Sequence, residues 1–250
     1  MNAAHFEYVQ RLGDNALILG QRLSQWCGHS PFLEEDIAMA NTALDLIGRA
    51  RMLYSHAAAL EGRGRDEDAL AYGRDERQFG NFLICELPNG DYAFTLIRQY
   101  LVDVYHHQLY AALCASQDTG LAAIAGKAVK ETAYHVRRSG DWVVRLGDGT
   151  AESHRRCQDA LDELWAYTAE MFSGDAIDGA MAEAGIGIAP DALAPAWRAE
   201  VEAQLALATL SVPREDWSAS GGRAGLHTEH MGHLLAELQF VQRAYPGLKW

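Results

Sequence analysis

The sequence predicts an all-α fold, in which long helices form an up-down bundle and further helices pack around it. Apolar residues recur at steps of three and four along most of the 250 residues, which is the spacing of one helix face. Alternating apolar and polar stretches are missing, and no Asn-Gly or Asp-Gly turn joins two β-rich segments. The six prolines all fall near expected helix boundaries.

Two long helices are expected first. The first covers residues 7–26, and Gly28 and His29 break it. Ser30 and Pro31 then read as the N-cap and first residue of a second helix that reaches residue 60. Acidic residues at positions 34–36 suit its first turn, because the helix dipole favours anions there. Shorter helices are expected within residues 66–87, before a turn at residues 88–90.

The remaining elements follow from caps and breaks. Asp91 is expected to begin a helix that reaches residue 116, and Asp118 or Thr119 one that ends at Gly147. A fifth helix is expected at residues 151–172, a looser stretch at 185–195 and a further helix to residue 210. A polar loop at 211–225 and a last helix at 226–245 complete the chain. With no internal repeat, residues 1–250 are predicted to form one domain.

Composition excludes several classes of function. The chain has 34 acidic and 21 basic residues, a formal net charge of −13, which argues against a general nucleic-acid binder or docking on anionic lipid. No segment has the roughly 18 to 20 apolar residues of a membrane helix, and no signal peptide is recognised. Four widely spaced cysteines are expected to be free, buried thiols, so the protein is predicted to be cytoplasmic.

Long helical bundles can hold two irons between Glu-x-x-His pairs and further carboxylates. No Glu in this chain has a His three residues later. Asp14 and Asp45 adjoin apolar positions, and His135 is expected to point inward as a hydrogen-bonded core residue. Asp103 and His106, one turn apart, are expected to form a hydrogen bond in the core.

Buried carboxylates need a metal ion or a counter-charge. Arg11, Arg49 and Lys130 are near in sequence, so a salt-bridged polar core satisfies these acids without iron. The histidines at 227, 230 and 233 drift around their helix and are expected to serve in capping and at an interface rather than in binding zinc.

Several segments together resemble one family. They are residues 11–15, 21–23, 26–29, 44–48, 74–79, 87–90, 98–100 and 225–230 (RLGDN, QRL, WCGH, LDLIG, RDERQF, LPNG, RQY and GLHTEH). The chain resembles the PaaC-type structural subunits of the bacterial ring-1,2-phenylacetyl-CoA epoxidase over nearly its whole length.

This resemblance implies a ferritin-like bundle inside a multicomponent, NADPH-dependent monooxygenase of aerobic phenylacetate degradation. A PaaA-type partner would carry the di-iron centre, and a reductase would be a further partner. In this chain the di-iron positions would be degenerate and without metal, either empty or salt-bridged. Carried over residue by residue, they are Asp14, Asp45, Gly48, Asp103, Thr132 and His135.

The expected function is therefore that of a non-catalytic subunit that pairs with and supports the di-iron subunit. A homodimer is a further possible state of the isolated chain. One alternative is a ferritin-like metalloenzyme active in its own right. Its metal ion would be held by the terminal histidines, or by His135 together with three acids, Asp14, Asp45 and Asp103. Another is a module that binds a coenzyme A ester through Arg49, Arg51 or Lys127. Trp197 and Trp217 are candidate interface residues.

Overall fold

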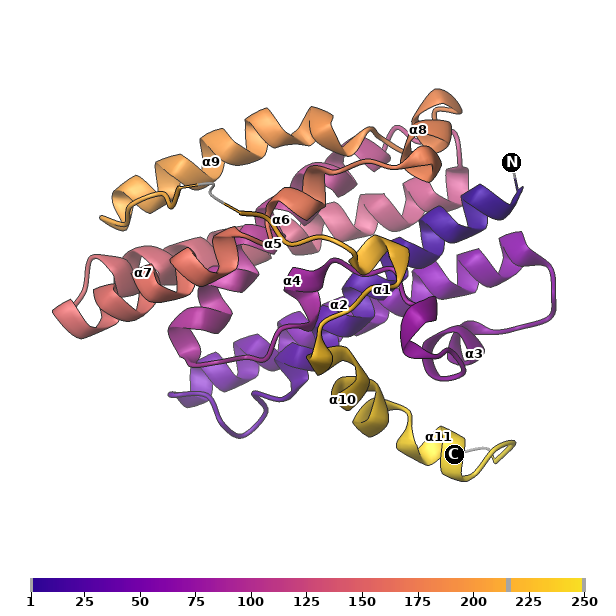
Figure 1. Ribbon diagram of the computed structural model, residues 1–250, viewed down its shortest axis with the longest axis horizontal. Helices are drawn as coiled ribbons and strands as arrows, with labels where there is room; N and C mark the ends of the chain where they lie inside the picture. Colours follow the sequence, from indigo (N-terminus) through magenta and orange to yellow (C-terminus); the bar gives the residue numbers. More distant parts are fainter. Residues whose placement is uncertain (1, 215–216, 249–250) are drawn as a thin grey trace. The chain divides into compact units, whose positions relative to one another are not determined.

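The computed structural model describes residues 2–214 and 217–248, and most of them are helical (Figure 1). The predicted class, an all-α ferritin-like bundle with additional helices, is confirmed, and the described residues contain no strand. Residue contacts divide the chain into two compact units, of residues 1–88 with 220–250 and of residues 89–219. The single domain over residues 1–250 stays a prediction.

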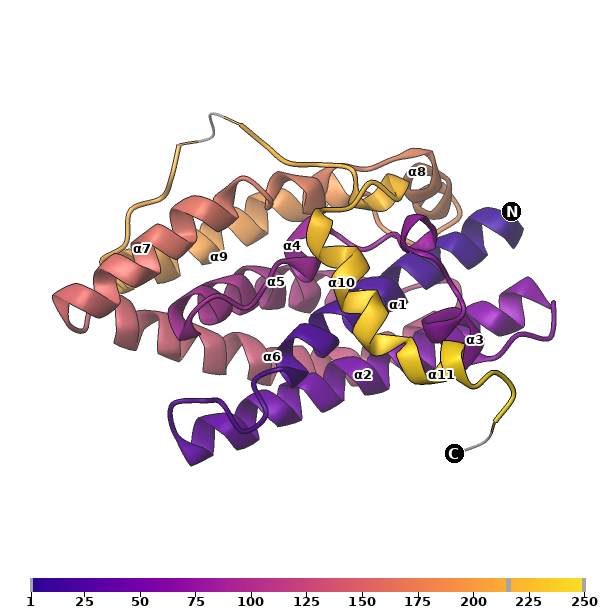
Figure 2. The ribbon, with the colours of Figure 1, turned by 60° about the horizontal axis from the view of Figure 1, so that its bottom comes forward.

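The first unit is built on a pair of long helices that run antiparallel and pack along their lengths, with the C-terminal helices against the segment that follows them (Figures 1 and 2). Its elements are α1 (Asn2–Ser24), α2 (Leu33–Glu61), α3 (Glu67–Tyr72), the 3-10 helix η1 (Glu76–Gln78), α4 (Leu83–Glu86), η4 (Gly222–Ala224), α10 (Glu229–Leu238) and α11 (Phe240–Ala244).

The boundaries of the first two helices differ from the expected ones. α1 ends at Ser24, and Phe32 rather than Ser30 is the N-cap of α2. The Gly28 N–H donates a 2.7 Å hydrogen bond to Asp36, which holds the intervening residues in the turn instead of the helix. α2 ends at Glu61, and its C-cap Gly62 has a left-handed φ of 68°, which glycine adopts at little cost.

The second unit contains another long helix pair, α5 with α6, against which α7 and α9 pack. Its elements are α5 (Tyr92–Leu113), α6 (Thr119–Gly147), α7 (Ala151–Trp165), η2 (Ala169–Phe172), α8 (Ala176–Glu183), η3 (Pro190–Leu193) and α9 (Ala194–Leu207). Asp91 and Asp118 cap α5 and α6, as predicted, by accepting backbone N–H bonds.

Two predicted helices are interrupted. The helix expected over 151–172 stops at Trp165, because the Thr168 hydroxyl donates to the Trp165 carbonyl and competes with the helical hydrogen bonds. The helix expected over 226–245 begins only after Thr228 and breaks into α10 and α11. α8 was not expected, and residues 215–216 of the predicted polar loop lie outside the described residues.

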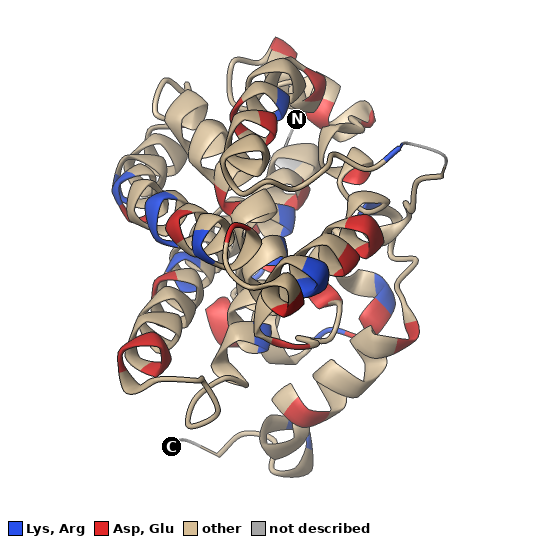
Figure 3. Ribbon diagram, turned by 90° about the vertical axis from the view of Figure 1, so that its left-hand side faces the viewer, with Lys and Arg blue, Asp and Glu red and all other residues tan. Residues whose placement is uncertain are grey.

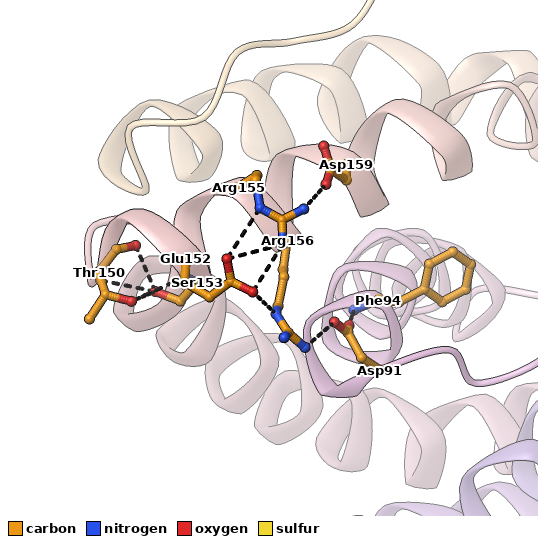
Figure 4. A network of polar contacts seen from close by, with 8 residues as sticks. All are labelled: Asp91, Phe94, Thr150, Glu152, Ser153, Arg155, Arg156 and Asp159. Atoms are coloured by element: carbon orange, nitrogen blue, oxygen red, sulfur yellow. Dashed lines mark hydrogen bonds and ion pairs between the residues drawn. The ribbon is translucent and has the colours of Figure 1, made fainter.

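Basic and acidic residues are interspersed along the helices (Figure 3). In the second unit, Arg156 joins Glu152 of its own helix to Asp91 at the start of α5, with N–O distances of 2.7 and 3.1 Å (Figure 4). This network ties α7 to the beginning of α5. No helix among residues 2–214 and 217–248 has the length and apolar character to cross a membrane.

The four cysteines are free, as predicted, but only Cys85 and Cys157 are buried. Burial raises the pKa of the Cys157 thiol to about 12. Cys27 and Cys114 are exposed, because each lies in or beside the turn that follows a long helix and not on a buried face.

Candidate functional site

Asp14, a predicted site residue of α1, has a fully buried carboxylate that is held by three other residues. The guanidinium of Arg74 forms a bidentate ion pair with it, with one N–O contact at 3.1 Å. The Tyr54 hydroxyl donates at 2.7 Å and the Gly80 N–H at 2.8 Å. Both carboxylate oxygens are thus occupied by donors from α2 and from the segment after α3.

Arg74 is fixed in place by its own surroundings. It lies between α3 and η1, where its Nε donates to the Leu70 carbonyl at 2.5 Å and its Nη1 to the Gln78 carbonyl at 2.7 Å. The guanidinium also lies 3.9 Å from the centre of the Phe79 ring, a cation–π arrangement. The cation is therefore positioned before any partner or ligand binds.

The pKa shifts agree with a permanent ion pair. Burial, and after it the Asp14 carboxylate, raise the pKa of the Tyr54 hydroxyl well above its ordinary value. Burial by itself lowers the pKa of Arg74, but the charge of Asp14 and the contact with Tyr54 outweigh burial and raise that pKa. Arg74 stays charged and Tyr54 stays neutral over the physiological range.

Arg74 was not among the basic residues expected to compensate the buried acids. Arg11 lies one turn before Asp14, but helical side chains lean toward the N-terminus, and Arg11 pairs with Glu7 at 2.8 Å. Arg49 is fully buried on α2. The actual partner is 60 residues away in sequence, so helical spacing could not reveal it.

The two α2 positions, Asp45 and Gly48, are both half-buried. A Cβ added to Gly48 would meet no other atom within 4 Å, so the chain leaves open space there. Glycine has no side chain that could bind a metal ion, so this position lacks the imidazole ligand that a metal site would require.

Asp103 is the centre of a buried polar cluster in the second unit. Gln99 donates to its Oδ1 at 2.6 Å, and the Ser139 hydroxyl donates to its Oδ2 at 2.9 Å. His135 of α6 is buried, as predicted, with its Nδ1 4.0 Å from the same carboxylate. Gln99 lies one turn toward the N-terminus of α5, the direction in which helical side chains lean. The predicted hydrogen bond between Asp103 and His106 stays a prediction.

Thr132, which would occupy the last carboxylate position, is also buried. Its hydroxyl bonds to the Ala128 carbonyl of the preceding turn at 3.0 Å and lies 3.2 Å from His107 Nδ1. Inside either unit of the described chain, no three His, Cys, Asp or Glu ligand atoms lie within 4.8 Å of one another. Neither unit's donor set by itself fits a di-iron centre.

Sequence reasoning missed a second buried cluster in the first unit, around Glu86 at the end of α4. His227 Nδ1 lies 2.7 Å from Glu86 Oε2, and the backbone N–H and hydroxyl of Thr228 donate to Oε1 at 2.6 and 2.8 Å. Asn81 donates to Oε2 at 2.9 Å. Arg22 of α1 binds the Glu86 carbonyl at 2.6 Å. The one available signal was a Glu inside the apolar run of residues 82–87.

His227 holds a charged ring in this cluster. Its Nε2 lies 3.0 Å from the Phe79 carbonyl, so both ring nitrogens face acceptors and both carry hydrogen. Burial opposes the charge, but the hydrogen bond and charge of Glu86 outweigh burial and raise the pKa of His227. His227 lies before the start of α10 and fastens the C-terminal segment to α4. The interface role expected of the three histidines stays a prediction.

The second unit has a cavity of about 530 Å³ among aromatic side chains that include Trp165, Phe172, Trp197 and Trp217. Trp197, expected at an interface, is instead buried, and its Nε1 donates to the Leu101 carbonyl at 2.9 Å. Trp217 is 67% exposed.

Two of the three basic residues considered for a coenzyme A ester have acidic partners of their own. Arg51 lies 3.1 Å from Glu67, and Lys127 lies 3.5 Å from Glu131. These contacts already compensate the two exposed cations.

The whole chain, residues 1–250, matches the family described as phenylacetic acid catabolic protein. The chain belongs to this family. It is also 53% identical over 243 residues to a subunit, designated C, of the 1,2-phenylacetyl-CoA epoxidase of Escherichia coli (strain K12), a match that covers 97% of this chain and 98% of that protein. In this phenylacetic acid catabolic protein, the carboxylate of α1 pairs with an arginine, and that of α5 accepts hydrogen bonds from a glutamine and a serine.

Proposed function

We propose that this chain is the corresponding subunit of a 1,2-phenylacetyl-CoA epoxidase and acts in phenylacetate degradation. The observation that carries this proposal is 53% identity along 97% of the chain to a subunit of an enzyme of that name. A likeness spread over the whole length concerns the whole architecture and not one shared motif. The four free cysteines suit a reducing compartment, so we place the complex in the cytoplasm.

Its role in the complex is structural, and the di-iron centre belongs to a PaaA-type partner. Iron prefers carboxylate and imidazole ligands, and a fixed guanidinium beside Asp14 repels a divalent cation. Gln99 and Ser139 already satisfy Asp103, while Gly48 and Thr132 offer no carboxylate or imidazole. These features support a bundle whose polar core stabilises the fold without metal.

The partners of the chain are the catalytic subunit, on which it packs helix against helix, and a reductase that delivers electrons from NADPH. The chain would keep the catalytic bundle folded and correctly assembled, and would contribute no group to the reacting atoms. The isolated chain would bind no coenzyme A ester.

Reconstitution tests this proposal. The catalytic subunit, the reductase and the remaining components are assayed for phenylacetyl-CoA-dependent NADPH oxidation with and without this chain. Activity should require the chain, and a complex containing Asp103→Asn should keep its turnover number once assembled. Turnover that falls a hundredfold in an intact Asp103→Asn complex, or oxygen consumption by the chain alone, would show a catalytic role instead.

A further inference from the structure

Helix α2 has a second apolar face in addition to the one it buries. Its core face includes Met39, Leu46 and Leu53, all at most 1% exposed. Beside that face, on the more exposed side of the helix, lie five apolar residues, named here the α2 seam: Leu33, Ile37, Ala40, Leu44 and Ile47. Leu33 and Leu44 leave 71% and 64% of their surfaces exposed. Apolar side chains gathered on one exposed helix face indicate a contact surface.

The spacing of the α2 seam indicates what kind of surface would cover it. Successive members are separated by four, three, four and three residues, which is the 3.5-residue period of the a and d positions in a coiled coil. Side chains at this period present knobs and holes to one helix lying along the seam. A flat sheet or a loop has no such period.

The charges beside the seam narrow the choice of helix. Glu34 and Asp36 occupy the flanking e and g positions of its first heptad. The remaining flanking positions, 41, 43, 48 and 50, are Asn, Ala, Gly and Ala, so none is basic. A second copy of this chain would bring the same acids and another net charge of −13 with no counter-charge at these positions. A helix with Lys or Arg beside its apolar residues complements them.

Two features at the end of the seam also suit a close neighbour. Gly48 lies in the middle of a long helix, where glycine costs about 1 kcal/mol relative to alanine, and a Cβ at this position would meet no atom of the described residues within 4 Å. Beside it, Ile47 and Arg51 border a hollow of about 280 Å³ with Tyr54 and Tyr72 on its wall. A neighbouring helix could approach at the glycine and insert a large side chain into the hollow.

We propose that the α2 seam is the face on which an amphipathic helix of the catalytic subunit packs, with basic residues flanking its own apolar seam. The proposal rests on the function proposed above and names the surface through which the two subunits pair. It gives Gly48 a role in close helix packing.

Binding of purified catalytic subunit to this chain, measured by titration, tests the proposal with Leu44→Glu as the variant. Leu44 is exposed, so the variant chain should unfold at the temperature of the wild type. A charge placed in the seam should weaken binding about tenfold or more. Leu207→Glu is the matched control, because Leu207 on α9 is 65% exposed and lies outside the seam, and it should bind within about twofold of wild type.

The outcomes separate this inference from the proposed function. A wild-type chain that binds no catalytic subunit would overturn both. Wild-type binding with equal affinity for Leu44→Glu would overturn the seam alone. Sedimentation of the isolated chain supplies the remaining comparison: a wild-type dimer that Leu44→Glu dissociates, with binding to the catalytic subunit unchanged, would make the seam a contact between two copies and contradict the proposal.

Discussion

Replacing Arg74 with methionine should destabilise the protein severely, because Arg74 supplies the positive charge that compensates the buried Asp14 carboxylate. The Asp14 side chain is 0% and the Arg74 side chain 3% exposed. Removing one member of a buried ion pair costs about 3–5 kcal/mol, since the other charge stays buried without compensation. Tyr54 and Gly80 would still donate to Asp14, but neither carries charge.

Circular dichroism measures the effect of the substitution, through the free energy of unfolding in a urea titration and through the Tm on heating. A chain of this size should lose about 6–20 °C in Tm for such a change. The double variant Asp14→Asn/Arg74→Met should recover part of the loss, with a coupling free energy of about 2 kcal/mol or more. Arg155→Met is the control, because Arg155 forms pairs exposed to solvent, and it should leave the Tm close to that of the wild type.

Two results would refute this reasoning. Arg74→Met could unfold within about 1 kcal/mol of the wild type, which would mean that the carboxylate is compensated without the guanidinium. Alternatively, the losses in Asp14→Asn and Arg74→Met could be additive in the double variant. Additive losses would show that the two side chains stabilise the fold independently and that no cation is needed at the α1 position.

Three further predictions concern the other buried groups. Because the pKa of His227 is raised, its pair with Glu86 contributes its full stability below the ordinary histidine pKa, and this stability is lost as the pH rises through the raised pKa. His227→Gln should abolish this part of the pH dependence of the free energy of unfolding, measured by urea titration. A pH profile equal to that of the wild type would contradict the pair. Ser139→Ala should cost about 1–3 kcal/mol, because Asp103 loses a donor; a neutral change in thermal unfolding would be inconsistent with the cluster. Trp197→Ala should cost about 3–5 kcal/mol as a core truncation, and a Tm equal to that of the wild type would place the ring at the surface.

The long helices could be predicted because their signals are local. Apolar periodicity predicted the four helices of both long pairs. Asp91 and Asp118 could be predicted as N-caps because each accepts a hydrogen bond from a backbone N–H within three residues. α8 was missed although Asp175 and Asp178 form a similar local cap. The break after Trp165 was missed because the Thr168 hydroxyl bond replaces a helical one without disturbing the apolar spacing.

The polar clusters were less predictable because their partners are distant in sequence. Burial of Asp14, Asp103, Thr132 and His135 followed from their places on apolar faces. The identity of the cation beside Asp14 could not be predicted, because Arg74 lies in an irregular segment that has no apolar periodicity. Only packing of the folded chain brings such residues together.

The metal content of the chain purified alone from iron-supplemented cells tests the central claim most directly. The account predicts far less than one iron or zinc ion per chain, unchanged in His135→Ala, and activity only after the catalytic subunit is added. One or two irons per chain that survive gel filtration and disappear in His135→Ala would contradict a structural, metal-free subunit and identify a metal centre of its own.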